Sequence, residues 1–112
     1  MSARSETRLW LVQRASAAVL ALCVLVHLVT MVVAVNGGLT AADILGRTRG
    51  SMVWAGFYGA FVLAVSIHAP IRLRTIGSEW LSWRGRGADA CWLAVGIALF
   101  AFGIRAVAAV VL

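Results

Sequence analysis

Three long apolar runs, separated by two short polar stretches, constrain the fold of this chain more than any other feature. They cover about residues 9–35, 51–73 and 88–112. Each is as long as the roughly 20 residues that an α-helix needs to cross about 30 Å of hydrocarbon. Only 12% of the residues are charged, about half the share of a typical soluble domain. The sequence therefore predicts an all-α integral membrane protein with three transmembrane helices, in one domain over residues 1–112.

Polar residues mark the expected ends of the first helix and the loop that follows it. We expect residues 1–8 to precede the helix as a disordered segment. Asn36-Gly37-Gly38 predicts its end, because Asn and Gly tolerate the left-handed conformation that closes helices. Thr40 and Asp43 then predict a capping box for a short surface turn. Further along, residues 74–87 predict a polar loop, with Asp89 as the cap of the third helix.

The arginines predict how the helices are oriented. All ten basic residues are Arg and lie mainly at the ends of apolar runs, which favours membrane topology over nucleic-acid binding. The first loop has only Arg47 and Arg49. The N-terminus and the second loop with its flanks have seven: Arg4, Arg8, Arg14, Arg72, Arg74, Arg84 and Arg86. Because cytoplasmic segments are rich in basic residues, we expect the N-terminus to be cytoplasmic.

Both histidines of the chain, His27 and His68, lie inside apolar runs. Polar side chains within a membrane are costly and normally face protein, water or a ligand. One buried histidine is often only hydrogen-bonded, but two favour metal ligation, and neutral imidazole is a good axial ligand of haem iron. We therefore interpret His68 and His27 as candidate haem ligands, with interhelical hydrogen bonding as the alternative.

The predicted depths of the two histidines differ by about 14 Å, counting 1.5 Å per helical residue from Arg14 and Arg72. Two axial ligands of one iron must lie at nearly the same depth. Either each histidine therefore meets a histidine of another subunit, giving two haems, or only one of them is a ligand. Both possibilities require a partner chain in a larger helical bundle.

The surroundings of His68 are suited to a close approach. Small residues recur every four positions on its face of the helix: Gly56, Ala60 and Ala64. Such a stripe lets another helix or a flat ligand approach the backbone. Pro70 lacks an N–H group, frees the carbonyl of Ser66 and can kink the helix beside His68.

Three arginines are candidates for binding haem propionates. Arg72 and Arg74 follow His68 at the predicted cytoplasmic surface, where lipid headgroups are the alternative partners. Arg105 lies within the outer half of the third helix. It either pairs with a propionate at the depth of His27 or extends to the outer membrane surface.

The motif His68-Ala69-x-Ile71, followed by Glu79-Trp80, resembles the pattern of the small cytochrome b membrane-anchor subunits of succinate dehydrogenase and fumarate reductase. In that family the second helix carries a haem-ligating His in a His-Ala-x-Ile-Gly context, and an Asp-Tyr pair follows near the quinone. The opening Gln13-Arg14-Ala15-Ser16-Ala17 is similar to the family's His-Arg-x-Ser-Gly, which helps line the quinone site. The resemblance covers most of the chain.

The resemblance implies five quinone-binding residues: Gln13, Arg14, Ser16, Glu79 and Trp80. The chain departs from the family pattern at some of them, since Trp80 replaces a Tyr and Gln13 replaces a His. Arg72 stands where the family often has Gly. For Glu79, a solvated carboxylate without a quinone role is the alternative.

The resemblance also implies a function and partners. The chain is expected to be a haem b-containing anchor of a succinate:quinone oxidoreductase in the bacterial cytoplasmic membrane. It would hold one or two haems together with a second anchor chain, either the same or different. A flavoprotein and an iron–sulfur subunit would dock on the cytoplasmic face, and electrons would pass between the iron–sulfur subunit and a quinone.

Two other function classes fit the same residues. One is a membrane b-type cytochrome without a dehydrogenase partner. The other is a small non-haem transport or assembly subunit, in which His27 and His68 only join helices. Apart from Asp89, the expected cap at the start of the third span, the predicted spans contain no acidic residue, which argues against a transporter.

Overall fold

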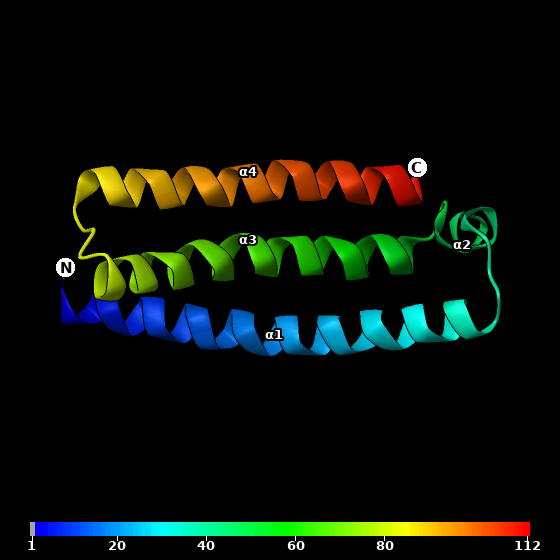
Figure 1. The fold of residues 1–112 in the computed structure, drawn as a ribbon, viewed down its shortest axis with the longest axis horizontal. Coiled ribbons are helices and arrows are strands. Elements are labelled where there is room, and N and C mark those ends of the chain that lie inside the picture. Colours follow the sequence, from blue (N-terminus) through cyan, green and yellow to red (C-terminus); the bar gives the residue numbers. More distant parts are fainter. Residues whose placement is uncertain (1) are drawn as a thin grey trace.

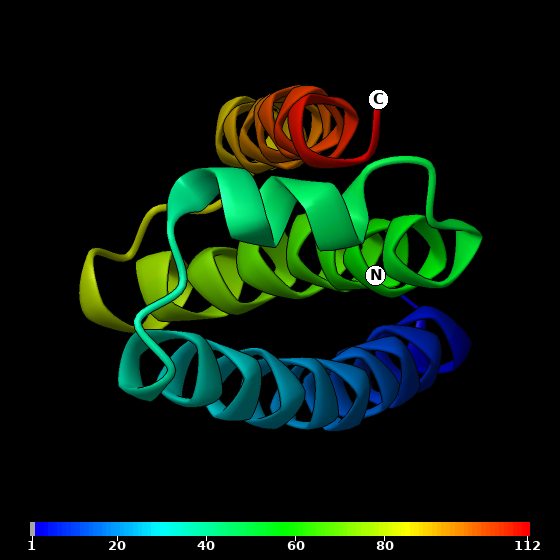
Figure 2. The same cartoon turned by 90° about the vertical axis from the view of Figure 1, so that its right-hand side faces the viewer.

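The computed structural model describes residues 2–112, which form four α-helices and no strand. They are α1 (Ala3–Asn36), α2 (Ala41–Thr48), α3 (Met52–Trp80) and α4 (Arg86–Val111). The three long helices lie side by side in one layer with α3 in the middle (Figure 1), and the short α2 lies across one end (Figure 2). We call this the C-terminal end of the bundle. The opposite, N-terminal end carries the N-terminus and the α3–α4 connection.

The three long helices are each long and apolar enough to cross a membrane. Their large apolar side chains remain on the surface, and among the described residues no large side chain is fully buried. Leu22, Leu25 and Val33 on α1 and Leu93 on α4 all expose more than half of their area. A layer of this kind needs lipid or other helices around it. The prediction of an all-α protein with three membrane-spanning helices is therefore confirmed.

The expected cap motifs around α2 are present. α1 ends at Asn36, and the following Gly38 adopts a left-handed φ of 67°. The Thr40 hydroxyl accepts from the backbone N–H of Asp43 at 3.2 Å, and the Asp43 carboxylate accepts from the Thr40 N–H at 2.8 Å. This reciprocal pair is a capping box that starts α2.

The helices at the N-terminal end are longer than the sequence predicted. α1 begins at Ala3, so the expectation of a disordered segment over residues 1–8 was wrong for the described residues 2–8. The side chain of Ser2 caps the helix by accepting from the Ser5 N–H. Helical hydrogen bonding does not stop where apolar residues stop, because capping and polar side chains also support it.

The predicted loop over residues 74–87 was also wrong, because α3 continues to Trp80 and only residues 81–85 connect it to α4. The hydroxyls of Thr75 and Ser78 donate to carbonyls of the preceding turn, at 3.1 and 2.9 Å, and so fit within a helix. Asp89 does not cap α4, which starts after Gly85 without a side-chain cap. Its carboxylate instead accepts from Arg74 on α3.

Glycines let α4 approach α3 closely at two places. A Cβ on Gly96 would lie 3.0 Å from the Ser66 carbonyl oxygen and 3.1 Å from the ring of Pro70. A Cβ on Gly103 would lie 2.5 Å from a methyl group of Val62. α4 therefore packs directly over the backbone carbonyl that Pro70 leaves without its helical donor.

At the C-terminal end, α2 is fixed to the end of α4. The hydroxyl of Thr48 donates to the Val110 carbonyl at 2.6 Å, and the Gly50 N–H donates to the Val111 carbonyl at 2.8 Å. These bonds satisfy two of the four carbonyls that the last turn of a helix leaves free. They close the bundle on the side opposite the N-terminus.

Candidate functional site

His68 and Ser16 meet across the interface between α3 and α1. The Nδ1 atom of His68 lies 3.3 Å from the Oγ atom of Ser16, which is buried with 8% of its area exposed. The hydroxyl of Ser16 donates its one proton to the carbonyl of Gln13 at 3.0 Å. Its oxygen is then left to accept, which favours the tautomer of His68 that carries the proton on Nδ1.

This tautomer has a direct chemical consequence. With the proton on Nδ1, the lone pair of the His68 Nε2 atom is free to bind a metal ion. Metal-bound histidines almost always donate their other ring N–H to a fixed acceptor, which orients the ring. The Ser16 hydroxyl provides such an acceptor, so the residues around His68 fit an axial ligand of haem iron.

The small-residue face next to His68 is only partly covered. Ala64, one turn away, is buried with 6% of its area exposed. Gly56 and Ala60, further along the same face, are exposed. The surface beside His68 is thus open toward the start of α3, at the C-terminal end of the bundle, and is available to another helix or a flat ligand.

His27 lies in an aromatic environment deeper in the bundle. Its ring contacts Tyr58 and Phe61 edge to face, with centroids 5.9 and 6.0 Å apart. Its Nδ1 atom lies 3.5 Å from the Tyr58 hydroxyl. His27 also lines a cavity of about 350 Å³ between α3 and α4, with Ile44 and Thr48 of α2 at its C-terminal end.

The two histidine contacts fix the register of α1 against α3 and so the relative depth of the histidines. Ser16 is level with His68, and His27 is level with Tyr58. Ten residues of α3 separate Tyr58 from His68, which is about 15 Å along the helix. His27 and His68 therefore cannot ligate the same iron, in agreement with the depth expected from the sequence.

The candidate propionate-binding arginines lie in different environments. Arg74 is paired within the chain, since its Nε atom lies 2.8 Å from an Asp89 carboxylate oxygen. Arg72 is exposed on α3, one turn beyond His68. Arg105 is exposed on α4, on a different face from Gly103 and Val107, which line the His27 cavity. Arg72 is thus the arginine placed nearest to His68 along its own helix.

The candidate quinone-binding residues form two groups. Gln13, Arg14 and Ser16 lie level with His68, and the guanidinium of Arg14 lies 5.3 Å from the ring centroid of Trp10. Glu79 and Trp80 are exposed in the last turn of α3. By the helix register they lie about 14 Å from the level of Arg14, toward the N-terminal end. The structure does not bring the two groups together within this chain.

Two contacts of this region were missed by the sequence analysis. Tyr58, the chain's single tyrosine, is the partner of His27. Its position ten residues before His68 could have indicated this contact, because it places Tyr58 near the expected depth of His27. Asp89 is the partner of Arg74. Opposite charges on either side of a predicted loop were the signal for that pair.

Fold and site together define a multi-pass membrane protein with two histidines at different depths between its first two spans. The chain matches the family model of the succinate dehydrogenase/fumarate reductase transmembrane subunit over residues 1–105. It belongs to this family, as the sequence motifs indicated. No curated protein and no solved structure shows a significant match to the chain.

Proposed function

We propose that the chain is a haem b-binding membrane anchor of a succinate dehydrogenase or fumarate reductase, with His68 as an axial ligand of the iron. The observation that carries this proposal is the hydrogen bond between His68 and Ser16, whose own proton is donated to Gln13. It leaves the Nε2 atom of His68 as a free ligand. A bound haem would supply a one-electron carrier between the iron–sulfur subunit and the quinone.

A second anchor chain, either a copy of this one or a different protein, would supply the opposite axial ligand. His68 is half-buried and has only Ser16 as a polar partner among the described residues. The exposed face of Gly56 and Ala60 and the apolar surface of α1 are open to such a partner. Arg72 is the residue we assign to a haem propionate, because it is exposed and lies one turn from His68.

For the quinone, we propose that Gln13 and Arg14 bind the headgroup beside His68, with Ser16 fixed by its bond to the histidine. Arg14 would donate to the oxygen on which negative charge develops during reduction. Glu79 and Trp80, closer to the N-terminal end, would border the route by which protons reach the quinone from the aqueous phase. This end would be cytoplasmic, as the arginine distribution predicts, and would receive the iron–sulfur and flavoprotein subunits.

A complex with two haems is favoured by the separation of about 15 Å between the two histidines, since each histidine could ligate its own iron. In that complex His27 is the ligand of the second haem. The Tyr58 hydroxyl must then accept from Nδ1 of His27 rather than donate to it.

The one-haem and two-haem proposals can be tested on the complex purified with its co-purifying subunits. The measurements are a reduced-minus-oxidised spectrum and the amounts of haem and flavin per complex. One b haem per flavin supports His68 as the single ligand of this chain. Two b haems per flavin support both His27 and His68 as ligands. A folded, flavin-containing complex without haem would refute the cytochrome proposal and leave a haemless anchor.

A further inference from the structure

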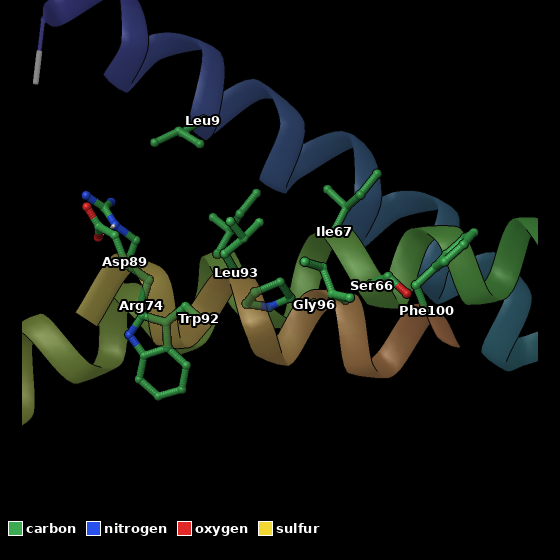
Figure 3. Close-up of a pocket in the computed structure, with 12 residues that line it drawn as sticks. Leu9, Ser66, Ile67, Arg74, Asp89, Trp92, Leu93, Gly96 and Phe100 are labelled. Atoms are coloured by element: carbon green, nitrogen blue, oxygen red, sulfur yellow. Dashed lines mark hydrogen bonds and ion pairs between the residues drawn. The ribbon is translucent and has the colours of Figure 1, made fainter. Parts of the chain in front are cut away.

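A long apolar groove runs along α3 and α4 on the side facing the start of α1. It encloses about 580 Å³ and is lined mainly by apolar side chains, among them Leu9, Ile67, Leu93, Ile97 and Phe100. Figure 3 shows Leu93 and Ile67 extending toward α1, with the Arg74–Asp89 pair at one end of the groove and Phe100 at the other. His68 does not line this groove, which is therefore distinct from the proposed haem site.

A polar cavity of about 430 Å³ lies at the N-terminal end of the groove, and we call it the polar cup. It is lined by residues from all three long helices and the α3–α4 connection, including Glu6, Arg74, Ser78, Trp83, Arg84 and Asp89. Arg74 and Asp89 line both cavities. The polar cup and the apolar groove are thus adjacent, and the Arg74–Asp89 ion pair lies where they meet.

The length of the groove matches one leaflet of a bilayer. From Asp89 to Phe100 there are eleven residues of α4, or about 16 Å at 1.5 Å per residue. Half of a hydrocarbon core about 30 Å thick is about 15 Å. An acyl chain fits this length, whereas a transmembrane helix of a partner would need a groove across the whole core.

The charges in the polar cup are of both signs. Arg74 and Asp89 are paired with each other at 2.8 Å, which leaves Arg84 and Glu6 without an ion-pair partner among the described residues. Arg84 uses one donor, toward the Ser78 carbonyl at 3.2 Å, and a guanidinium has five. One available cation and one available anion suit a headgroup that carries a phosphate and an ammonium group.

We propose that the polar cup and the groove bind a phospholipid with a primary ammonium headgroup, such as phosphatidylethanolamine. Arg84 contacts the phosphate, Glu6 contacts the ammonium group, and one acyl chain lies along Leu93, Ile97 and Phe100. Trp83 borders the headgroup with an aromatic face, which also attracts a cation. A lipid without an amine leaves Glu6 unpaired, and a quinone offers neither charge.

The lipid proposal can be tested by native mass spectrometry. The delipidated complex is mixed with equal amounts of phosphatidylethanolamine and phosphatidylglycerol, and the lipid that stays bound is identified. We expect one phosphatidylethanolamine to be retained in preference to phosphatidylglycerol. Glu6→Gln should lower that preference about three- to tenfold, the effect of losing one hydrogen bond of ordinary strength at an exposed side chain. Arg84→Gln should weaken the binding of both lipids, while Arg49→Gln at the C-terminal end serves as the matched arginine control.

The groove is tested separately by Ile97→Trp, which fills it. Ile104→Trp, on the same helix but outside the groove, is the control for the added bulk. We expect only Ile97→Trp to abolish retention of the lipid. Equal retention of both lipids by the unmodified complex, an unchanged preference in Glu6→Gln, or equal retention in the two tryptophan variants would overturn the proposal. The haem spectrum is a separate readout, so failure of the lipid site and failure of the haem proposal are distinguishable.

Discussion

The imidazole of His68 and the hydroxyl of Ser16 lie 3.3 Å apart and join α3 to α1. Ser16 donates to the Gln13 carbonyl of its own helix, so a local contact in α1 favours one tautomer of a ring on α3. Both residues belong to motifs that the sequence identified separately. Their contact makes Ser16 a positioning residue for the proposed ligand as well as a candidate for the quinone site.

Removal of the Ser16 hydroxyl should weaken haem binding without removing the ligand. In Ser16→Ala, Nδ1 of His68 loses its acceptor, and the ring loses its preferred tautomer and orientation. Loss of such a partner typically costs about 10- to 100-fold in metal affinity. Haem retention and the midpoint potential of the purified complex measure the effect.

Two control variants separate this effect from general destabilisation. Ser16→Thr keeps a hydroxyl and should retain most of the haem. Ser66→Ala removes a serine on α3 that donates only to the Val62 carbonyl of its own helix, and it should leave the potential unchanged. A potential that is the same in Ser16→Ala and in the unmodified complex would contradict the positioning role.

The close contact of α4 with α3 predicts different tolerances for two glycines of α4. Gly103→Ala places a Cβ 2.5 Å from a methyl group of Val62, a stiff β-branched side chain. Such overpacking costs about 1–3 kcal/mol. Gly87→Ala, near the start of the same helix, meets no atom within 4 Å. Thermal denaturation of the complex in detergent should show a lower midpoint for Gly103→Ala alone, and equal midpoints would disprove the close approach.

The capping box of α2 predicts a specific pH dependence. Hydrogen bonds from the Thr40 N–H and hydroxyl lower the pKa of Asp43 below its ordinary value of 3.8. Because the folded-state pKa is depressed, the contribution of Asp43 to stability is present above about pH 4. It is lost as the pH falls from there through the lowered pKa. Backbone amides at the start of α2 should keep their hydrogen-exchange protection from pH 7 to pH 5, after correction for intrinsic rates.

The matched variant for this prediction is Asp43→Asn, which keeps the shape of the side chain without its charge. It should reduce protection at the start of α2 between pH 7 and pH 5 and remove the change below pH 4. Protection that is lost already between pH 7 and pH 5 would show that another group controls the cap.

Sequence reasoning predicted those features that depend on local composition. The lengths of the apolar runs predicted the three spans. Residues 36–38 predicted the end of α1, and Thr40 with Asp43 predicted the cap of α2. The same approach placed the start of α1 and the end of α3 wrongly. Hydropathy reports where lipid can surround a helix, whereas the helical hydrogen bonds of Thr75 and Ser78 continue beyond that point.

The site was predictable as a set of residues but not as a set of contacts. His68 and Ser16 could be named from their motifs, but their contact depends on the register between α1 and α3. That register is defined by the contacts Ser16–His68 and His27–Tyr58, which join residues distant in sequence. The same register separates Glu79 and Trp80 from Arg14, although the family motif suggested one quinone site.

The haem content of a His68→Ala complex, compared with the unmodified complex at equal flavin content, tests directly whether His68 ligates the iron. We predict that His68→Ala loses the haem that this chain ligates, while the flavoprotein and iron–sulfur subunits remain bound. A His68→Ala complex with unchanged haem content and an unchanged difference spectrum would show that His68 is not an axial ligand.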